Sequence, residues 1–83
     1  MSKHEKIVAR LISRPKDFEW GELKLLMEAF GYELKTTGGS GRRFIHPRTG
    51  ATLFLHEPHP AKVLKAHQVK DAINFLKQEG HIL

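Results

Sequence analysis

The spacing of apolar residues predicts a helix at the start of the chain. Apolar side chains recur at three- and four-residue steps over residues 3–13, which is typical of an amphipathic helix. They are Ile7, Val8, Leu11 and Ile12. Ser2 and Glu5 have the spacing of a capping box, in which a side chain and the backbone satisfy each other's free donors. Pro15 disfavours helical backbone at Arg14 and therefore ends the helix.

Two more stretches have the helical period. The first begins near Trp20 and ends before Gly31, a residue suited to the position after a helix. Its apolar face consists of Trp20, Leu23, Leu26, Met27 and Phe30, and a stripe of this kind is typical of core packing. The second begins near Ala66 and stops at Gly80. Its apolar face consists of Val69, Ala72, Ile73 and Leu76.

Between these helices the period changes to two, which indicates strands. We expect strands over residues 32–36, 42–46 and 51–56. Pro47 and Gly50 suit the second and last positions of a turn, so the last two strands should form an antiparallel hairpin. The predicted fold is α+β, in the order α-α-β-β-β-α. Its helices should pack on one face of a three-stranded antiparallel sheet. We expect residues 1–83 to form a single domain in which residues 1–14 add an N-terminal helix.

Positive charge is concentrated in the middle of the chain. Residues 1–34 carry six cations and six anions, and residues 66–83 carry two of each. Residues 35–65 carry six cations against Glu57 alone, which accounts for the whole formal charge of +5. A localised basic surface indicates a polyanionic partner. The alternative is a solvated surface that only keeps the protein in solution.

A glycine-rich loop precedes two adjacent arginines, in the order Gly38, Gly39, Ser40, Gly41, Arg42, Arg43. Glycine lets backbone approach a ligand closely, and arginine offers forked, permanently charged donors for phosphate oxygens. This stretch predicts a phosphate-contact site, and the ligand that we expect is RNA. It lacks the Gly-Lys-Ser/Thr ending of a nucleotide-binding P-loop, which argues against an NTPase.

The alternation of a strand separates the two arginines. If Phe44 packs against the helices, Arg43 and Ile45 point to the other face of the sheet, while Arg42 and His46 share the side of Phe44. One arginine would then hold an RNA phosphate. The alternative is that both only guard a sheet edge against aggregation. His46 has a catalytic interpretation and a structural one, as the residue before a proline at a strand end.

Lys62 and Lys65 flank the predicted start of the last helix, where free amides and the helix dipole attract phosphate. This arrangement would recognise the shape and phosphates of a duplex rather than base sequence. We expect the surplus cations of residues 35–65 to form one solvent-facing platform beside that helix.

The chain has no cysteine and no apolar run near the length of a membrane span. We therefore expect a soluble, cytoplasmic protein with no disulfide and no membrane partner. His46, His56 and His59 form a possible zinc set with Glu57 between them, but the absence of a thiolate argues against it. We predict no metal site.

Three runs, taken in order, resemble the HicA-type mRNA interferase toxins. They are Glu22-Leu23-x-x-Leu26 through Gly31-Tyr32, Gly39-Ser40 through Phe44-x-His46-Pro47, and His59-Pro60-x-Lys62-x-Leu64-Lys65. The resemblance extends from Glu22 to Gly80. It implies a fold like that of double-stranded-RNA-binding domains, cleavage of mRNA without a metal or other cofactor, and neutralisation by a HicB-type antitoxin.

The sequence departs from this family at one position. Such toxins usually have a catalytic histidine directly after the Gly-Ser pair, and here that position is Gly41. Glycine cannot transfer protons as imidazole does. Three interpretations stay open: a subgroup that uses other residues, an RNA-binding member without turnover, and a disarmed variant. A further possibility is a protein that only binds its antitoxin.

These interpretations define the candidate site. The residues proposed for catalysis are His46, Arg43 and Arg42. The residues proposed to contact RNA are Lys35, Ser40, Arg42, Arg43, Lys62 and Lys65.

Overall fold

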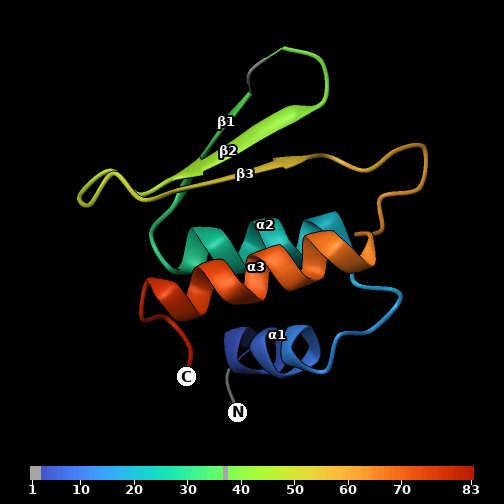
Figure 1. Cartoon of the computed structure of the whole chain (residues 1–83), viewed down its shortest axis with the longest axis horizontal. Coiled ribbons are helices and arrows are strands. Elements are labelled where there is room, and N and C mark those ends of the chain that lie inside the picture. The colour runs from blue at the N-terminus through green and yellow to red at the C-terminus, as the bar shows by residue number, and fades with distance from the viewer. Residues whose placement is uncertain (1–2, 37) are drawn as a thin grey trace.

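The computed structural model describes residues 3–36 and 38–83 (Figure 1). Within them the elements are α1 (Lys3–Ile12), α2 (Trp20–Ala29), β1 (Glu33–Thr36), β2 (Gly41–Ile45), β3 (Thr52–His56) and α3 (Ala66–Gln78). The predicted α+β order is confirmed, and the observed bounds differ from the expected ones by at most two residues. Ser2, on which the predicted capping box depends, lies outside the described residues.

The three strands form one antiparallel sheet with β2 in the centre. The predicted hairpin of β2 and β3 is confirmed, and its turn is closed at His46. The His46 amide donates to the Ala51 carbonyl at 2.9 Å, and the His46 carbonyl accepts from the Gly50 amide at 2.8 Å. This turn sets the register that pairs Phe44 with Leu53.

The molecule has three layers (Figure 1). α2 and α3 lie side by side against one face of the sheet, and α1 packs on them from the side away from the sheet. Within residues 3–36 and 38–83, no helix covers the other face of the sheet, which we call the open face. The prediction that helices pack on one face is confirmed.

The core fills the space between the sheet and the helices and continues down to α1. Phe44 from the central strand and Phe18 from the connector after α1 are both fully buried. α1 contributes Ile7 and Leu11 to the same cluster. Burying such side chains is the main favourable term in folding.

α1 also carries a side chain that we expected on its buried face. Ile12 is 47% exposed, because the helix ends there and the chain turns away toward Pro15. The helix is instead tied to α2 by Arg10, which donates from Nε and Nη2 to the Glu22 carboxylate at 2.8 and 3.0 Å. α1 is therefore held by the apolar stripe of Ile7 and Leu11 and by the ion pair of Arg10 with Glu22.

We predict that Leu11→Ala destabilises the whole protein, because it removes a fully buried side chain and leaves a cavity between α1 and the other helices. The expected loss in the free energy of unfolding is about 2–5 kcal/mol, measured by urea denaturation. Ile12→Ala is the matched control on the same helix, and we expect it to change stability by about 0.5 kcal/mol. Equal effects of the two substitutions would show that α1 is not part of the core.

Candidate functional site

The glycine-rich loop between β1 and β2 is attached to the end of β3. Gly38 and Gly39 have positive φ values of 83° and 55°, which glycine adopts without steric cost. The Ser40 carbonyl accepts a hydrogen bond from the Glu57 amide at 2.8 Å. The loop therefore delivers the side chain of Ser40 to the residues that follow β3.

A small hollow of about 360 Å³ opens beside this loop. It is lined by Gly39, Ser40, Arg42, Glu57, His59 and Lys62, and we call it the loop hollow. It brings together three of the residues that the sequence predicted to contact RNA, namely Ser40, Arg42 and Lys62. Its lining includes Arg42 and Lys62, whose charged donors suit phosphate oxygens.

One carboxylate organises the loop hollow. Glu57 accepts a hydrogen bond from Arg42 Nε at 3.0 Å and from Lys62 Nζ at 2.7 Å. Arg42 also donates from Nη1 to the carbonyls of Gly39 and Gly41, both at 2.9 Å. The hydrogen bond from Lys62 and the charges of Lys62 and Arg42 hold the pKa of Glu57 below its ordinary value, although burial opposes this shift. The carboxylate is therefore charged at neutral pH and fixes both cations.

A buried amide fixes the segment between β3 and α3. The Gln68 side chain is 5% exposed. It donates from Nε2 to the His56 carbonyl at 2.8 Å and accepts at Oε1 from the Lys65 amide at 3.0 Å. Lys62 is held from the other side, because its carbonyl accepts from the Trp20 amide at 2.9 Å. The positions of His56 and Lys62 are thus set by the helix layer.

His56 is the residue that sequence reasoning missed. It stands directly across from Gly41 in the register of β2 and β3. Its Nδ1 lies 3.1 Å from Ser40 Oγ, at hydrogen-bonding distance, and its side chain is exposed. The predicted turn at residues 47–50 already implied this pairing, because counting outward from it brings residue 56 opposite residue 41.

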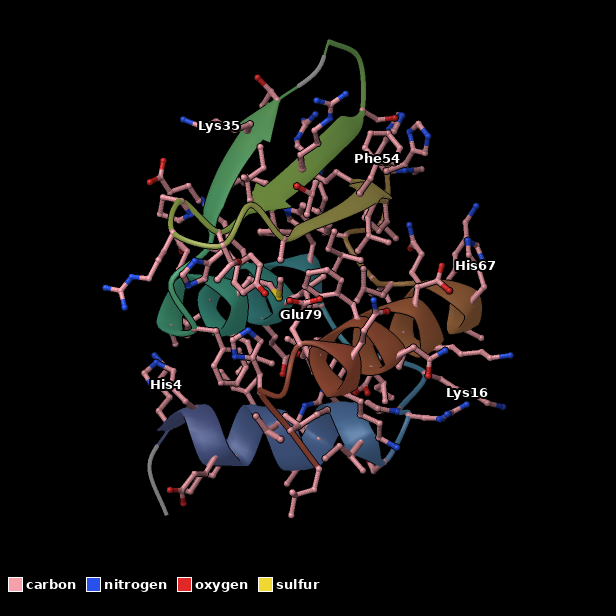
Figure 2. All side chains as sticks on the ribbon, turned by 60° about the vertical axis from the view of Figure 1, so that its left-hand side comes forward. His4, Lys16, Lys35, Phe54, His67 and Glu79 are labelled. Carbon is pink, nitrogen blue, oxygen red and sulfur yellow. The ribbon has the colours of Figure 1, made fainter. Side chains whose placement is uncertain are left out.

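The open face of the sheet carries a separate group of residues. Lys35 of β1 pairs with Arg43 of β2, which pairs in turn with Phe54 of β3. The three side chains are exposed, and residues paired across a sheet share a face. Figure 2 shows Phe54 at the level of the sheet, away from the helices. The prediction that Arg42 and Arg43 lie on opposite faces is confirmed.

His46 lies at the other end of β2 from Arg42 and does not join the loop hollow. Its Nδ1 accepts from the amides of Arg48 and Thr49 at 3.2 and 3.4 Å. Its ring packs edge-on against Tyr32, with centroids 5.1 Å apart. The structure does not bring the predicted catalytic residues His46, Arg42 and Arg43 together, because strand length and strand alternation separate the three. The structural interpretation of His46 describes its contacts.

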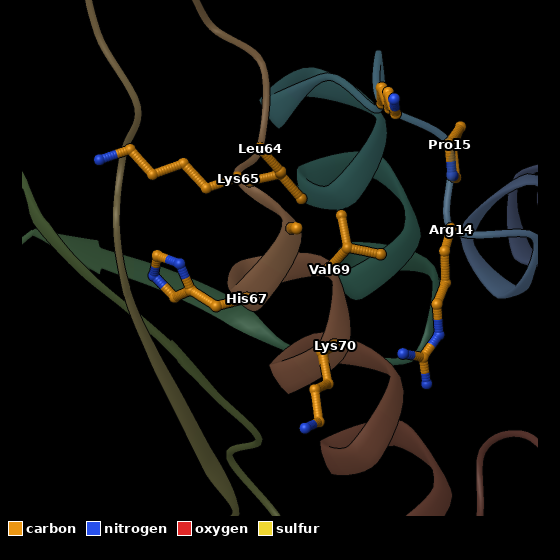
Figure 3. A pocket seen from close by; sticks show the side chains of 9 residues that line it. Arg14, Pro15, Leu64, Lys65, His67, Val69 and Lys70 are labelled. Carbon is orange, nitrogen blue, oxygen red and sulfur yellow. The ribbon is translucent and has the colours of Figure 1, made fainter.

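Lys65 lines a different hollow, of about 650 Å³, between the connector after α1 and the start of α3 (Figure 3). Leu64 and Val69 lie between Lys65 and Arg14 in this view. Arg48 lies in the turn after β2, at the opposite end of that strand from Arg42. The expected single platform of cations is therefore wrong, since the surplus cations occupy both faces and both ends of the sheet.

Residues 3–36 and 38–83 contain neither a cluster of metal ligands nor a membrane-spanning helix. No group of three or more His, Asp or Glu residues is arranged to hold a metal ion. None of the helices in this part of the chain has the length and apolar character to cross a membrane.

Comparison with known protein families assigns the chain. Residues 20–80 match the family model described as HicA toxin of bacterial toxin-antitoxin. The chain belongs to the HicA toxin family. The match begins at the first residue of α2 and includes every residue of the loop hollow, whereas α1 lies outside it. Neither a search of curated proteins nor a search of solved structures gave a match.

Membership makes this HicA protein a toxin of the toxin–antitoxin class and implies that an antitoxin pairs with it. The fold agrees with this assignment, because a three-stranded antiparallel sheet follows α2 and precedes α3.

The contact between His46 and Gly31 gives a prediction about stability. Gly31 has a φ of +96°, and a Cβ at this position would lie 3.0 Å from His46 Nε2. Gly31→Ala should therefore cost more than backbone strain alone, with a loss of about 2–4 kcal/mol in the free energy of unfolding.

Gly80 is the matched control for this prediction. It also follows a helix and has a φ of +78°, but among the described residues nothing lies within 4 Å of an added Cβ. We expect Gly80→Ala to cost about 1 kcal/mol. Addition of His46→Ala to Gly31→Ala should recover part of the difference. Equal losses at Gly31 and Gly80 in urea denaturation would contradict the structural interpretation of His46.

The hydrogen bonds to Glu57 predict a pH dependence of stability. Because its pKa is lower in the folded chain than the ordinary value of 4.5, the unfolded chain binds more protons as the pH falls through that range. The stabilisation from Glu57 is therefore complete well above pH 4.5 and is lost as the pH falls below it. We expect Glu57→Gln to be less stable than the unsubstituted protein at pH 7, with the gap narrowing toward pH 3 in urea denaturation.

Asp71→Asn, at an exposed carboxylate of α3, is the control for this pH series. Its difference from the unsubstituted protein should stay small throughout. A gap for Glu57→Gln that stays constant or widens on acidification would contradict the assigned role of the carboxylate.

Proposed function

We propose that this HicA toxin is an endoribonuclease that cleaves mRNA without a metal ion, with His56 as its proton-transfer group. The observation that carries the proposal is the position of His56 opposite Gly41, with Nδ1 3.1 Å from Ser40 Oγ. An imidazole thus stands beside the Gly-Ser pair, although glycine occupies position 41. The resemblance to the HicA family supplies the reaction and its independence of metal.

The proposed reaction is an internal transesterification. The RNA 2′-oxygen forms a bond to the adjacent phosphorus, and the bond from phosphorus to the 5′-oxygen breaks. His56 takes the proton of the 2′-hydroxyl, and a second imidazole, His59 on the rim of the loop hollow, gives a proton to the leaving 5′-oxygen. The products are a 2′,3′-cyclic phosphate and a 5′-hydroxyl. Imidazole suits both steps because its ordinary pKa is close to neutral.

Arg42 and Lys62 would stabilise the developing negative charge of the phosphate from the loop hollow, and His56 would act from the open face. Ser40 connects the two, because it lines the hollow and its Oγ lies 3.1 Å from His56 Nδ1. Arg42 and Lys62 are both fixed in advance by Glu57, and preorganised charge of this kind needs no reorganisation during the reaction. Within residues 3–36 and 38–83, Arg42 donates its hydrogen bonds from Nε and Nη1. We therefore assign Nη2, which makes none of these bonds, to the phosphate. Ser40 would hold the His56 ring and hydrogen-bond to a phosphate oxygen.

The antitoxin that we propose is a HicB-type protein whose contact surface is acidic. The formal charge of +5 and the exposed cations Arg43, Lys35 and Lys62 support this proposal, because complementary charge directs association. mRNA is a cytoplasmic substrate, and we propose that the toxin acts in the cytoplasm.

A cleavage assay with a labelled mRNA in the presence of EDTA tests the proposal. We expect the unsubstituted toxin to produce fragments that end in a 2′,3′-cyclic phosphate. His56→Gln should slow cleavage by about 10²–10⁴-fold, because general acid–base catalysis typically contributes that much. His4→Gln is the control, since His4 lies on α1 at the far end of the molecule (Figure 2), and it should leave the rate unchanged.

Gly41→His separates this proposal from its main alternative, an RNA-binding member without turnover, which the glycine at position 41 favours. If the unsubstituted protein leaves RNA intact while Gly41→His cuts it, the chain is not a nuclease. Retention of RNA that weakens steeply as salt is added would then support the binding function.

A further inference from the structure

Phe54 is an exposed aromatic side chain on the open face of the sheet. It is 48% exposed although it lies in β3, between two buried residues, Leu53 and Leu55. The alternation of the strand turns its ring away from the core. The other large apolar side chains that are exposed in the described chain, Ile12 and Leu83, belong to α1 and the C-terminal end.

The surroundings of Phe54 are basic and aromatic. Arg43 stands directly across from it on β2, and Lys35 follows on β1. The ring of His56 lies 5.2 Å away in an edge-on arrangement, with an interplanar angle of 83°. Glu33 offsets part of the charge through an ion pair with Lys35 at 3.5 Å. The group therefore offers a ring for stacking, with cations across the sheet from it and an imidazole next to it along β3.

We propose that Phe54 stacks against an unpaired base of the RNA, while Arg43 and Lys35 contact the backbone of the same strand. The inference rests on the proposed function only in taking RNA as the partner. Aromatic side chains beside a positively charged track are the usual means of binding single strands, because every base has a face on which a ring can stack. The substrate would then be a single-stranded stretch of RNA.

This inference differs from the duplex recognition that the sequence predicted. Lysines at a helix start predicted recognition of duplex shape, but an exposed ring on a sheet face cannot reach bases that are stacked inside a duplex. The arrangement also joins the two groups of residues. Phe54 and His56 are neighbours on one face of β3, so a base on Phe54 brings its backbone toward Ser40 and His56.

Two substitutions of Phe54 test the role of its ring. Phe54→Leu keeps an apolar side chain but removes the aromatic face, and Phe54→Trp enlarges that face. The probe is a single-stranded 12-mer of 2′-O-methyl RNA, which has no free 2′-hydroxyl and cannot be cleaved by transesterification. We expect Phe54→Leu to weaken binding by about tenfold to a hundredfold and Phe54→Trp to retain it.

Fluorescence gives a second readout. Trp20 is buried, at 6% exposure, so the unsubstituted protein should show little change when the probe is added. The indole introduced by Phe54→Trp should be quenched by stacking. Ile12→Leu is the control for a change at an exposed apolar residue far from the sheet. The duplex form of the probe should bind more weakly than the single strand.

Each result supports the inference or overturns it. Unchanged affinity in Phe54→Leu, absence of quenching in Phe54→Trp, or tighter binding of the duplex would overturn it. If Phe54→Leu keeps the probe but loses a purified antitoxin, the open face is a protein-docking surface and the inference is also overturned. Because the probe cannot be cleaved, loss of catalysis with stacking intact would count against the proposed function alone.

Discussion

The pairing of β2 with β3 determines the position of nearly every side chain that matters here. The four-residue turn at 47–50 closes with both hydrogen bonds of His46. From this point the register places Phe44 in the core and Phe54 on the open face, and it brings His56 opposite Gly41. A shift by one residue would exchange the two faces of the hairpin. The burial of Phe44 opposes such a shift, so the core itself maintains the arrangement of the candidate site.

The hydrogen bonds and ion pairs near the end of β3 connect the sheet to the helices. Gln68 is a buried polar residue whose amide is satisfied at both ends, by the His56 carbonyl and the Lys65 amide. Loss of either partner would leave a buried polar group unpaired, which costs more than the bond contributes. Glu57 has a comparable role for charged groups, because its carboxylate forms ion pairs with both Arg42 and Lys62 and keeps them close together. The loop hollow is therefore shaped by the same contacts that stabilise the fold.

The sequence was sufficient for the elements and insufficient for the site. Periodicity predicted the helices, because apolar residues such as Leu23 of α2 and Leu76 of α3 belong to a series that recurs on one face of each helix. Pro47 and Gly50 predicted the turn of the hairpin. Strand alternation predicted that Arg42 and Arg43 face opposite sides, but charge counts did not indicate which cations share a hollow. Lys62 joins Arg42 in the loop hollow, whereas Lys65 lines a different one. Long-range bonds such as those of Glu57 depend on how the segments after β3 cross the molecule, which no local pattern encodes.

Under the proposed function, position 56 supplies from β3 the imidazole that the family resemblance leads us to expect at position 41 on β2. Residues directly opposite in an antiparallel ladder have Cα atoms roughly 4.5–5.5 Å apart, and their side chains leave the sheet on the same face. An imidazole on β3 can therefore reach much of the space that one on β2 would fill, provided that its neighbour across the ladder is small. Gly41 meets that condition, and Ser40 holds the ring of His56 by its Nδ1. In the proposed mechanism, the glycine at position 41 and the imidazole at position 56 are therefore two parts of one arrangement.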